Sequence, residues 1–409
     1  MAIVVQKFGG SSVSTPERMR RVAARIGKTF ADGNKVVVVV SAMGDTTDDL
    51  IDLCHQVCTN PSPRELDMLL SVGEQQSIAL LAMTLTELGY PAISLTGLQA
   101  GFVTDGRYGK ARISAIDNSR VIDELDDDKI VIVAGFQGMG EKGDITTLGR
   151  GGSDTSAVAL AVALKADVCE IYTDVDGVYT ADPRIAKNAR KMLEISYDEM
   201  LEMAAMGALV LQPRSVELAK EYGVVLHVRS SFNDVPGTIV KEKVDMKTAM
   251  EKEMIVSGVA HDLNVLKVTL FGVPDRPGVA GEIFTKISEL GVNVDMIIQS
   301  GSRDMRQDIS FTCGRDERNK VEPFLKSVVR SLPAESYTVV DTIAKISVVG
   351  AGMISHPGVA ATMFRALADK NINIFMITTS EIKISCIIDE TQINDAVLAL
   401  HTAYGLDVE

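Results

Sequence analysis

Five consecutive valines, Val36 to Val40, constrain the fold of this chain more than any other feature. Valine is β-branched and favours a strand, and a strand without polar positions must be covered on both faces. Five more apolar runs, which alternate with longer helical stretches, are strand candidates: 3–6, 92–95, 129–136, 168–173 and 224–228. The alternation predicts a three-layer α/β/α sandwich with a mostly parallel sheet. Ligands of such sheets bind beyond the carboxyl ends of the strands.

The first apolar run ends in a lysine that precedes a glycine-rich loop, Lys7-Phe8-Gly9-Gly10-Ser11-Ser12-Val13. Glycines let backbone N–H groups approach an anion, and a helix that begins near Pro16 would direct its positive end to the same place. In the P-loop the lysine follows the glycines, so a different phosphate-binding arrangement is indicated here. A tight turn without a ligand is the alternative.

A second glycine loop, Gly149-Arg150-Gly151-Gly152-Ser153-Asp154, precedes the apolar stretch 157–164. We interpret Ser153 and Asp154 as N-cap residues of a helix whose free N–H groups face a ligand above the glycines. Arg150 adds a planar guanidinium that suits a carboxylate or a phosphate. A capped helix after a flexible turn is the alternative reading of this segment.

The composition restricts the class of partner. The 409 residues are 46% hydrophobic and carry a net charge of −14, which argues against nucleic acid or an anionic membrane as a partner. No apolar run approaches the length that spans a bilayer. Five scattered cysteines fit reduced thiols in a cytoplasmic protein. Two or three domains are expected from the length.

Three motifs resemble known dinucleotide or metal sites, but the neighbouring sequence does not fit such a site. Gly138 to Gly143 has the spacing of a dinucleotide fingerprint, yet its last glycine leads into β-branched residues and not into a helix. Asp174 to Gly177 resembles a calcium loop with its glycine two positions early. Cys54 and Cys58 lack a second ligand pair for zinc. We therefore expect no protein metal site from these motifs.

The C-terminal third contains a repeat. Residues 277–300 and 357–380 are identical at nine of 24 positions, beginning with Pro-Gly-Val-Ala in both copies. Each copy has the pattern of a βαββαβ unit, but the second has almost no chain left for its last strand. We expect residues 255–260 to supply that strand. The predicted division is 1–245 for the α/β domain, 246–264 for a linker with this strand, and 265–341 and 342–409 for the two copies.

Two anion-binding loops suit the transfer of a phosphoryl group from ATP to an acceptor. None of the five histidines lies near either loop in the sequence. A hydroxyl acceptor would need a general base, whereas a carboxylate acceptor is already ionised at neutral pH. The converging negative charge needs neutralisation by Lys7, Arg150, helix N-termini and Mg²⁺. The loops therefore favour a kinase that acts on a carboxylate.

These residues resemble the aspartate kinase family. The resemblance is carried by the segments 7–13, 71–74, 149–154 and 172–184 and by the repeat, which is similar to paired regulatory ACT domains. It implies ATP-dependent phosphorylation of the β-carboxylate of L-aspartate to 4-phospho-L-aspartate. That reaction begins lysine, threonine and methionine biosynthesis in the cytoplasm. End products such as lysine or threonine, or both, would inhibit through the ACT domains.

The resemblance also implies roles for individual residues. Lys7, Arg150 and Asp154 would be catalytic. ATP would contact Lys7, Phe8, Gly9, Gly10, Ser41, Ser153, Thr173, Asp174, Tyr179 and Arg184. Aspartate would contact Thr47, Glu74, Arg150, Gly151, Gly152 and Asp154, with Glu74 facing its amino group and Arg150 its α-carboxylate. Effector pockets would include Asp275, Asn293, Val294, Asp295 and Gln299 in the first copy and Met376, Ile377, Ser380 and Glu381 in the second.

One departure from the family pattern concerns Leu209, where a nucleotide-contacting lysine is usual. A catalytically weak or inactive amino-acid sensor therefore stays open as an alternative. A sibling amino-acid kinase with another carboxylate acceptor is the second alternative. The resemblance further implies a homo-oligomer formed through the ACT domains. Whether a start at Met246, Met250 or Met254 yields a second, regulatory-only chain is left open by the sequence.

Overall fold

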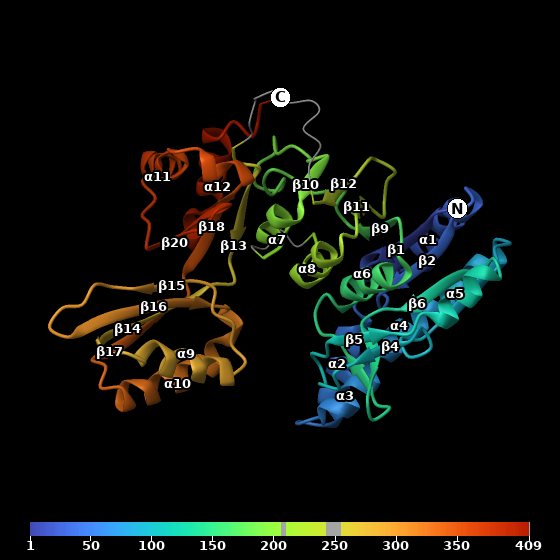
Figure 1. Ribbon diagram of the computed structural model, residues 1–409, viewed down its shortest axis with the longest axis horizontal. Coiled ribbons are helices and arrows are strands. Elements are labelled where there is room, and N and C mark those ends of the chain that lie inside the picture. The colour runs from blue at the N-terminus through green and yellow to red at the C-terminus, as the bar shows by residue number, and fades with distance from the viewer. Residues whose placement is uncertain (206–209, 243–254, 409) are drawn as a thin grey trace. The chain divides into compact units, whose positions relative to one another are not determined.

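The computed structural model describes residues 1–205, 210–242 and 255–408. The described residues form two units, one of residues 1–178, 191–205 and 210–242 and the other of residues 179–190 and 255–408. In Figure 1 the first unit runs from blue to green and the two repeats are orange and red. Leu209 lies outside the described residues. Segment 179–190 belongs to the unit that contains the repeats, although it lies within the part of the chain expected to form the α/β domain.

The first unit is built on an eight-stranded sheet that is parallel except where β11 meets β12. In spatial order its strands are β10 (Glu194–Ser196), β12 (Thr238–Lys241), β11 (Leu226–Ser230), β9 (Val168–Thr173), β1 (Ile3–Phe8), β2 (Lys35–Val40), β6 (Ile130–Ala134) and β3 (Ala92–Leu95). The helices of the unit are α1 (Pro16–Ala31), α2 (Thr46–Val57), α3 (Pro63–Leu70), α4 (Val72–Glu87), α5 (Ser119–Asp126), α6 (Gly152–Leu164), α7 (Tyr197–Ala205) and α8 (Pro213–Tyr222).

The five valines of β2 are fully buried, as their sequence predicts. Val36, Val38 and Val40 face a core that α1 and α4 complete. The opposite face of β1, β2 and β9 is covered by α6, which is itself buried along most of its length. The expected α/β domain with a largely parallel sheet is confirmed.

A second, small sheet in this unit was not predicted. Its strands are β5 (Ile113–Ile116), β4 (Phe102–Thr104), β7 (Gln137–Gly140) and β8 (Ile145–Thr147), in that spatial order. The false dinucleotide fingerprint lies here, because Gly138 and Gly140 are strand residues and Gly143 forms the turn of the β7–β8 hairpin. This hairpin ends just before the Arg150 loop.

Each repeat forms a four-stranded antiparallel sheet with two helices on one face, as expected. The first consists of β14 (Leu266–Pro274), α9 (Val279–Glu289), β15 (Ile297–Gln299), β16 (Arg306–Cys313), α10 (Arg318–Ser331) and β17 (Ser336–Val340). The second consists of β18 (Ile343–Val349), α11 (Val359–Asp369), β19 (Met376–Thr379), β20 (Lys383–Asp389) and α12 (Ile393–Ala403), with β13 (Gly258–Asp262) paired antiparallel to β18. Figure 1 shows α9 and α10 together on one side of the β14–β16 sheet.

Segment 179–190 packs into the core of the second repeat. Ala181 and Ala186 are buried with Val256, Val259 and residues of α11 and α12. The main chain of Thr180 accepts a hydrogen bond from Val259 N (2.8 Å). The Thr180 hydroxyl lies 2.9 Å from His401 Nε2. The segment is therefore a structural part of that repeat.

One helical stretch of the described residues, Pro63–Glu87, contains a segment long and apolar enough to cross a membrane by length and composition. The sequence expectation that no such stretch exists was wrong on that criterion. The stretch combines α3 and α4, which are separated only by Ser71. It also carries Asp67 and Glu74, which are 1% and 3% exposed and bonded to protein atoms. This pattern is that of a core helix with a polar role.

Candidate active site

The carboxyl ends of β1, β2 and β6 meet at one edge of the large sheet. The register pairs Phe8 with Val40 and Val40 with Ala134. Main-chain hydrogen bonds continue past the strands, from Ser41 N to Phe8 O (3.1 Å) and from Gly135 N to Val40 O (3.1 Å). The loop that follows β1 therefore lies directly beside the loop that follows β2.

Lys7 and Asp154 come together across this edge. Lys7 Nζ lies 2.6 Å from Asp154 Oδ1, and the two side chains are only 12% and 10% exposed. The ammonium group also lies over Gly9, because a Cβ built on Gly9 would be 3.4 Å from Nζ. Asp154 Oδ1 has no partner within hydrogen-bond angles among the described residues, so the contact is an ion pair. The two glycine loops of the sequence thus contribute to one site.

The helix that carries Asp154 begins differently from the expectation. Its N-cap is Gly151 in the left-handed conformation (φ +68°), whereas Ser153 and Asp154 lie in the first turn. Gly152 packs so closely on Leu148 and Phe136 that a side chain there would meet both within 2.9 Å. The prediction of Ser153 and Asp154 as N-cap residues was wrong because the glycine fits the cramped turn. The free N–H groups still belong to the turn that holds Asp154.

Glu74 is a buried carboxylate near the end of β2. It lies in the first turn of α4, 3% exposed, and Oε1 accepts a hydrogen bond from Ala42 N at 3.0 Å. Oε2 is buried and has no hydrogen-bond partner among the described residues. Burial raises the pKa of Glu74 to about 7, against the lowering effect of the Ala42 N–H. A buried oxygen without a donor indicates a place for a ligand that donates.

Other residues of the expected aspartate site lie on the same elements. Arg150 is exposed in the turn before α6, between Gly149 and Gly151, which both have positive φ. Thr47 is half-buried in the first turn of α2, the helix that follows the β2 loop. Gly73 precedes Glu74 and packs against Ala42, because a Cβ there would lie 2.7 Å from Ala42 Cβ. The α4 start and the β2 loop are therefore in tight contact.

The expected nucleotide contacts divide between the two units. Phe8 is fully buried and stacks on Tyr172 with ring centroids 4.6 Å apart, so only its main chain can face a ligand. Thr173 is the last residue of β9, and the exposed Asp174 follows it. Tyr179 and Arg184 belong to the segment packed into the second repeat, where Arg184 bonds with both oxygens of Asp182. The structure does not bring these two to the Lys7 site within one unit.

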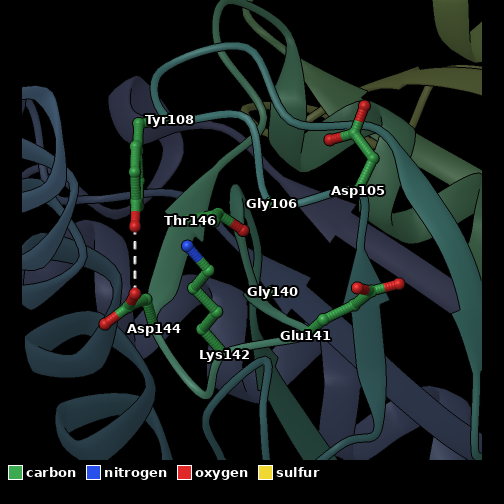
Figure 2. A pocket seen from close by; sticks show the side chains of 8 residues that line it. All are labelled: Asp105, Gly106, Tyr108, Gly140, Glu141, Lys142, Asp144 and Thr146. Atoms are coloured by element: carbon green, nitrogen blue, oxygen red, sulfur yellow. Dashed lines mark hydrogen bonds between the residues drawn. The ribbon is translucent and has the colours of Figure 1, made fainter.

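A separate cavity of about 270 Å³ lies on the small sheet. Figure 2 shows its lining, with Tyr108 OH directed at Asp144 Oδ2 (2.9 Å) and Lys142 pointing into the hollow. The lining residues are Asp105, Gly106, Tyr108, Gly140, Glu141, Lys142, Asp144 and Thr146. None of the residues expected to bind aspartate or ATP lines it. We do not assign the chemistry to this cavity.

The effector residues expected in the repeats are partly engaged with protein groups. Asp295 Oδ2 accepts a hydrogen bond from Lys345 Nζ at 2.7 Å, which joins the two repeats. Gln299 donates to Gln307 Oε1. Met376 is 5% exposed in a small core with Val265 and Met296, so its side chain is a packing residue. Asn293, Ile377, Ser380 and Glu381 are exposed, and Asp275 and Val294 are half-buried.

Sequence reasoning missed two residues beside the Arg150 loop, Asp67 and Arg214. Asp67 is 1% exposed and accepts hydrogen bonds from Gly109 and Thr147. Arg214 Nη1 and Nη2 donate to Leu148 O and Ala111 O. A signal for Asp67 was present, since it lies seven residues before Glu74 on one helical stretch and thus on the same face.

The fold and the site together define a class of protein. Residues 2–230 match the amino acid kinase family, and residues 267–329 and 346–404 each match the ACT domain. A kinase unit with two glycine loops around Lys7 and Asp154, followed by two ACT domains, is the combination that the sequence predicted.

Comparison with individual proteins narrows this class. The chain is 54% identical over 409 residues to the aspartokinase of Mycolicibacterium smegmatis, covering 99% of this chain and 97% of that one. It is similar to the structure of E. coli aspartokinase III in complex with aspartate and ADP (TM-score 0.82, 25% identity, 98% and 99% of the two chains covered). It is also similar to that enzyme in complex with lysine and aspartate (TM-score 0.75, 25% identity, 98% and 99% covered). The chain belongs to the aspartokinases, which are phosphotransferases of the amino acid kinase family.

Proposed function

We propose that the Lys7 site transfers the γ-phosphoryl group of ATP to the β-carboxylate of L-aspartate. The observation that carries this assignment is the buried Oε2 of Glu74, which lacks a donor among the described residues. An ammonium group supplies such a donor together with the compensating charge. The E. coli relative was solved with aspartate and ADP, which supports both substrates.

Two charges of the site match two of the three ionised groups of aspartate. Glu74 would accept from the amino group, and the exposed guanidinium of Arg150 would bind the α-carboxylate through two parallel hydrogen bonds. Thr47, Gly151, Gly152 and Asp154 would line the remaining pocket. The β-carboxylate then stays free to react.

Phosphoryl transfer at this site needs no general base. An oxygen of the β-carboxylate forms a bond to the γ-phosphorus, the bond from that phosphorus to the bridging oxygen breaks, and ADP leaves with the electron pair. The carboxylate is already ionised, so no proton moves. Lys7, lying over Gly9, would stabilise charge on the transferring group, and the N–H groups of Gly9, Gly10 and the α6 start would support it.

Mg²⁺ fits this arrangement as a partner of the nucleotide. Among the described residues no group of three or more His, Cys, Asp or Glu side chains is arranged to hold a metal ion. Magnesium in kinases is commonly held by substrate phosphates with one or two carboxylates. Asp154 and Asp174 are the carboxylates of the expected site that could take that part. When bound, Mg²⁺ would neutralise charge on the phosphates.

Hydroxylamine trapping tests this function directly. The enzyme is incubated with ATP, Mg²⁺ and either aspartate, glutamate or acetylglutamate, and the acyl phosphate is measured as its hydroxamate. Aspartate should give product and the other two acceptors should not. Product with glutamate alone would indicate the sibling kinase, and no product with any acceptor would indicate an inactive sensor.

Variants of the site sharpen the test. Glu74→Ala and Arg150→Ala should each raise the KM for aspartate by roughly 30-fold to 900-fold, because each strands a partner charge worth about 2 to 4 kcal/mol. Glu87→Ala, exposed on the same helix α4, is the matched control and should behave as wild type. A change confined to the KM for ATP would refute the assignment.

We further propose that lysine, which was bound in one structure of the E. coli relative, inhibits this enzyme through its ACT domains. Threonine, alone or with lysine, is the alternative effector. Gln299→Ala should raise the inhibitory concentration of lysine by about 5-fold or more, within the usual range of allosteric coupling. Glu289→Ala, exposed at the end of α9, is the control. If neither amino acid inhibits the wild type, the regulatory proposal fails.

The remaining proposals concern assembly and location. We propose a homo-oligomer formed through the ACT domains, with or without a regulatory-only chain, as the family resemblance implies. A cytoplasmic location is supported by five cysteines that are all free thiols, three of them buried. Sedimentation of the purified enzyme with and without lysine tests the oligomer.

A further inference from the structure

We propose that Asp67 is a positioning residue that fixes the loop carrying Arg150, and with it the α-carboxylate end of the aspartate pocket. The inference rests on the proposed role of Arg150. Asp67 lies on α3, seven residues before Glu74. The same helical stretch would therefore carry Glu74, which binds the amino group of aspartate, and Asp67, which holds the loop of the Arg150 that binds the α-carboxylate.

Both oxygens of Asp67 are occupied by donors from two other segments. Oδ1 accepts from the Thr147 hydroxyl at 2.7 Å and from Gly109 N at 3.1 Å. Oδ2 accepts from Thr147 N and from Gly109 N, each at 2.9 Å. Asp67 is 1% exposed, and among the described residues no Lys or Arg pairs with it. A buried carboxylate held only by neutral donors is costly unless every bond is in place.

A carboxylate is the group that this arrangement requires. All three groups that meet Asp67 are donors, and an ionised carboxyl group is the side chain that only accepts. An asparagine of the same size would keep one acceptor oxygen and direct an NH₂ group at the other donors. Asp67→Asn therefore weakens the hydrogen bonds to Thr147 and Gly109 with almost no change in side-chain volume.

Asp67 fixes the position of Arg150 through Thr147, which lies three residues before it. Thr147 is the last residue of β8, its N–H bonds to Asp67, and its carbonyl accepts from Ala111 N at 2.9 Å. Leu148 N donates to Phe136 O at 2.8 Å. Gly149 then turns with φ +77° against Gly109, whose carbonyl oxygen would lie 3.0 Å from a Cβ at Gly149. Asp67 thus holds both the strand that leads to Arg150 and the loop beneath it.

Arg214 secures the same two segments from α8. Its guanidinium donates to Leu148 O at 3.1 Å and to Ala111 O at 3.0 Å. Gln212, just before α8, packs on Gly151, where a Cβ would overlap its Cγ at 2.0 Å. The main chain on both sides of Arg150 is therefore fixed, whereas the Arg150 side chain itself is exposed. Such a frame fixes the position from which the Arg150 side chain extends, so that only the side chain has to be ordered on binding.

Asp144 provides a matched control in the same small sheet. It accepts hydrogen bonds from Tyr108 OH (2.9 Å) and Arg64 Nε (3.0 Å), as Figure 2 shows for Tyr108. Among the described residues, no hydrogen bond joins the Asp144 side chain to Thr147 or Gly109, the two residues that Asp67 holds. Its loss should loosen the rim of the cavity and leave the Arg150 loop in place.

The test compares steady-state kinetics of Asp67→Asn and Asp144→Asn with the wild type. Asp67→Asn should raise the KM for aspartate on the order of 10-fold to 100-fold, the scale of a misplacement near 1 Å, and leave the KM for ATP within about twofold. Asp144→Asn should leave both constants within about twofold. Equal loss in both substrates' KM, or an unchanged KM for aspartate in Asp67→Asn, overturns the proposal.

A double variant separates this inference from the proposed role of Arg150. If Asp67 acts through Arg150, Asp67→Asn should raise the KM for aspartate much less in an Arg150→Ala enzyme than in the wild type. Full additivity would show that Asp67 acts elsewhere. If Arg150→Ala alone leaves the KM for aspartate unchanged, the proposed function of Arg150 fails instead.

A milder variant covers the case in which Asp67→Asn does not fold. Thr147→Val removes only the hydroxyl donor to Asp67 Oδ1 and keeps the main-chain bond. It should raise the KM for aspartate by about 3-fold to 10-fold with the KM for ATP unchanged, since one hydrogen bond is lost. An unchanged KM for aspartate in this variant also overturns the proposal.

Discussion

Lys7 Nζ and Asp154 Oδ1 lie 2.6 Å apart at the carboxyl end of β1, and this ion pair joins the two glycine loops. The pair is nearly enclosed by protein, where electrostatic interactions are stronger than in water. It places a cation directly over Gly9. In the proposed function this cation is the group that meets the phosphates of ATP.

Replacement of Lys7 by alanine should lower kcat by about 10²-fold to 10³-fold, the scale for loss of one preorganised donor. The KM for ATP should change less, because the charge converging on the transferring group is greatest in the transition state. Rapid-quench measurement of acyl phosphate formation separates chemistry from product release. Lys28→Ala, on the last turn of α1, is a surface control. A raised KM for ATP with near-normal kcat would contradict the role.

The raised pKa of Glu74 predicts the pH dependence of aspartate binding. The proposed contact of Glu74 with the ammonium group of aspartate needs the ionised carboxylate, and burial raises the pKa of Glu74 to about 7. The ratio kcat/KM for aspartate should therefore rise as the pH increases through about 7. Glu74→Gln should remove this rise while lowering the value at high pH. A profile that is the same in wild type and Glu74→Gln would show that another group titrates.

The same raised pKa of Glu74 makes the stability of the protein fall as the pH rises, whereas aspartate binding improves. Glu74 has a native pKa of about 7 and an ordinary value of 4.5, so the native state binds more protons between these pH values. Its contribution to the free energy of unfolding is present below pH 4.5 and is lost as the pH rises to about 7. Thermal melts of Glu74→Gln should show a smaller decline than the wild type across that window. An identical decline would mean that Glu74 is solvated.

A substitution of Gly10 tests how closely the loop after β1 packs against the loop after β2. A Cβ there would lie 2.8 Å from Ala42 O, a main-chain atom that cannot rotate away. Gly10→Ala should destabilise the kinase domain by about 1 to 3 kcal/mol, as overpacking does, and should impair binding of both substrates. Gly281→Ala is the control, because nothing lies within 4 Å of that position in α9. It should stabilise the chain by about 0.5 to 1 kcal/mol. Equal melting temperatures for the two variants would disprove this packing argument.

The Asp295 and Lys345 pair predicts a rescue experiment. Lys345 is 6% exposed at its side chain and Asp295 is 42% exposed, so solvent weakens the pair on one side. Asp295→Ala should still destabilise the ACT unit by about 1 to 2 kcal/mol, because it leaves a buried ammonium without its partner. Adding Lys345→Met should restore most of that loss. Failure of the second change to restore the unfolding midpoint would show that Asp295 acts through another contact.

Much of the fold was predictable because its signals are local. The valine run of β2 and the Pro-Gly-Val-Ala repeat are contiguous in the sequence, and each determines an element or a domain copy. The small sheet was missed because its strands are three or four residues long and include Gly138 and Gly140, which are typical of turns. The left-handed Gly151 was missed because the close packing of α8 on that turn is invisible in the sequence.

The parts of the site that escaped prediction depend on long-range contacts. Glu74 and Arg150 were assigned by resemblance, and the structure adds that Glu74 accepts a hydrogen bond from Ala42 N in the loop after β2. The partners Asp67 and Thr147 are 80 residues apart, and no periodic pattern links them. Attachment of Thr180 to His401 spans 221 residues. Such pairs are determined by tertiary structure alone.

The attachment of residues 179–190 has a consequence for any polypeptide that begins at Met246. Such a chain would contain every strand and helix of both ACT domains, including β13. It would lack Ala181 and Ala186, which fill the side of the second ACT core next to Val259, and the hydroxyl partner of His401. Its second ACT domain would expose an apolar strip that the full-length chain covers from within. A regulatory chain that began there would therefore lack the segment that completes this core in the full-length chain.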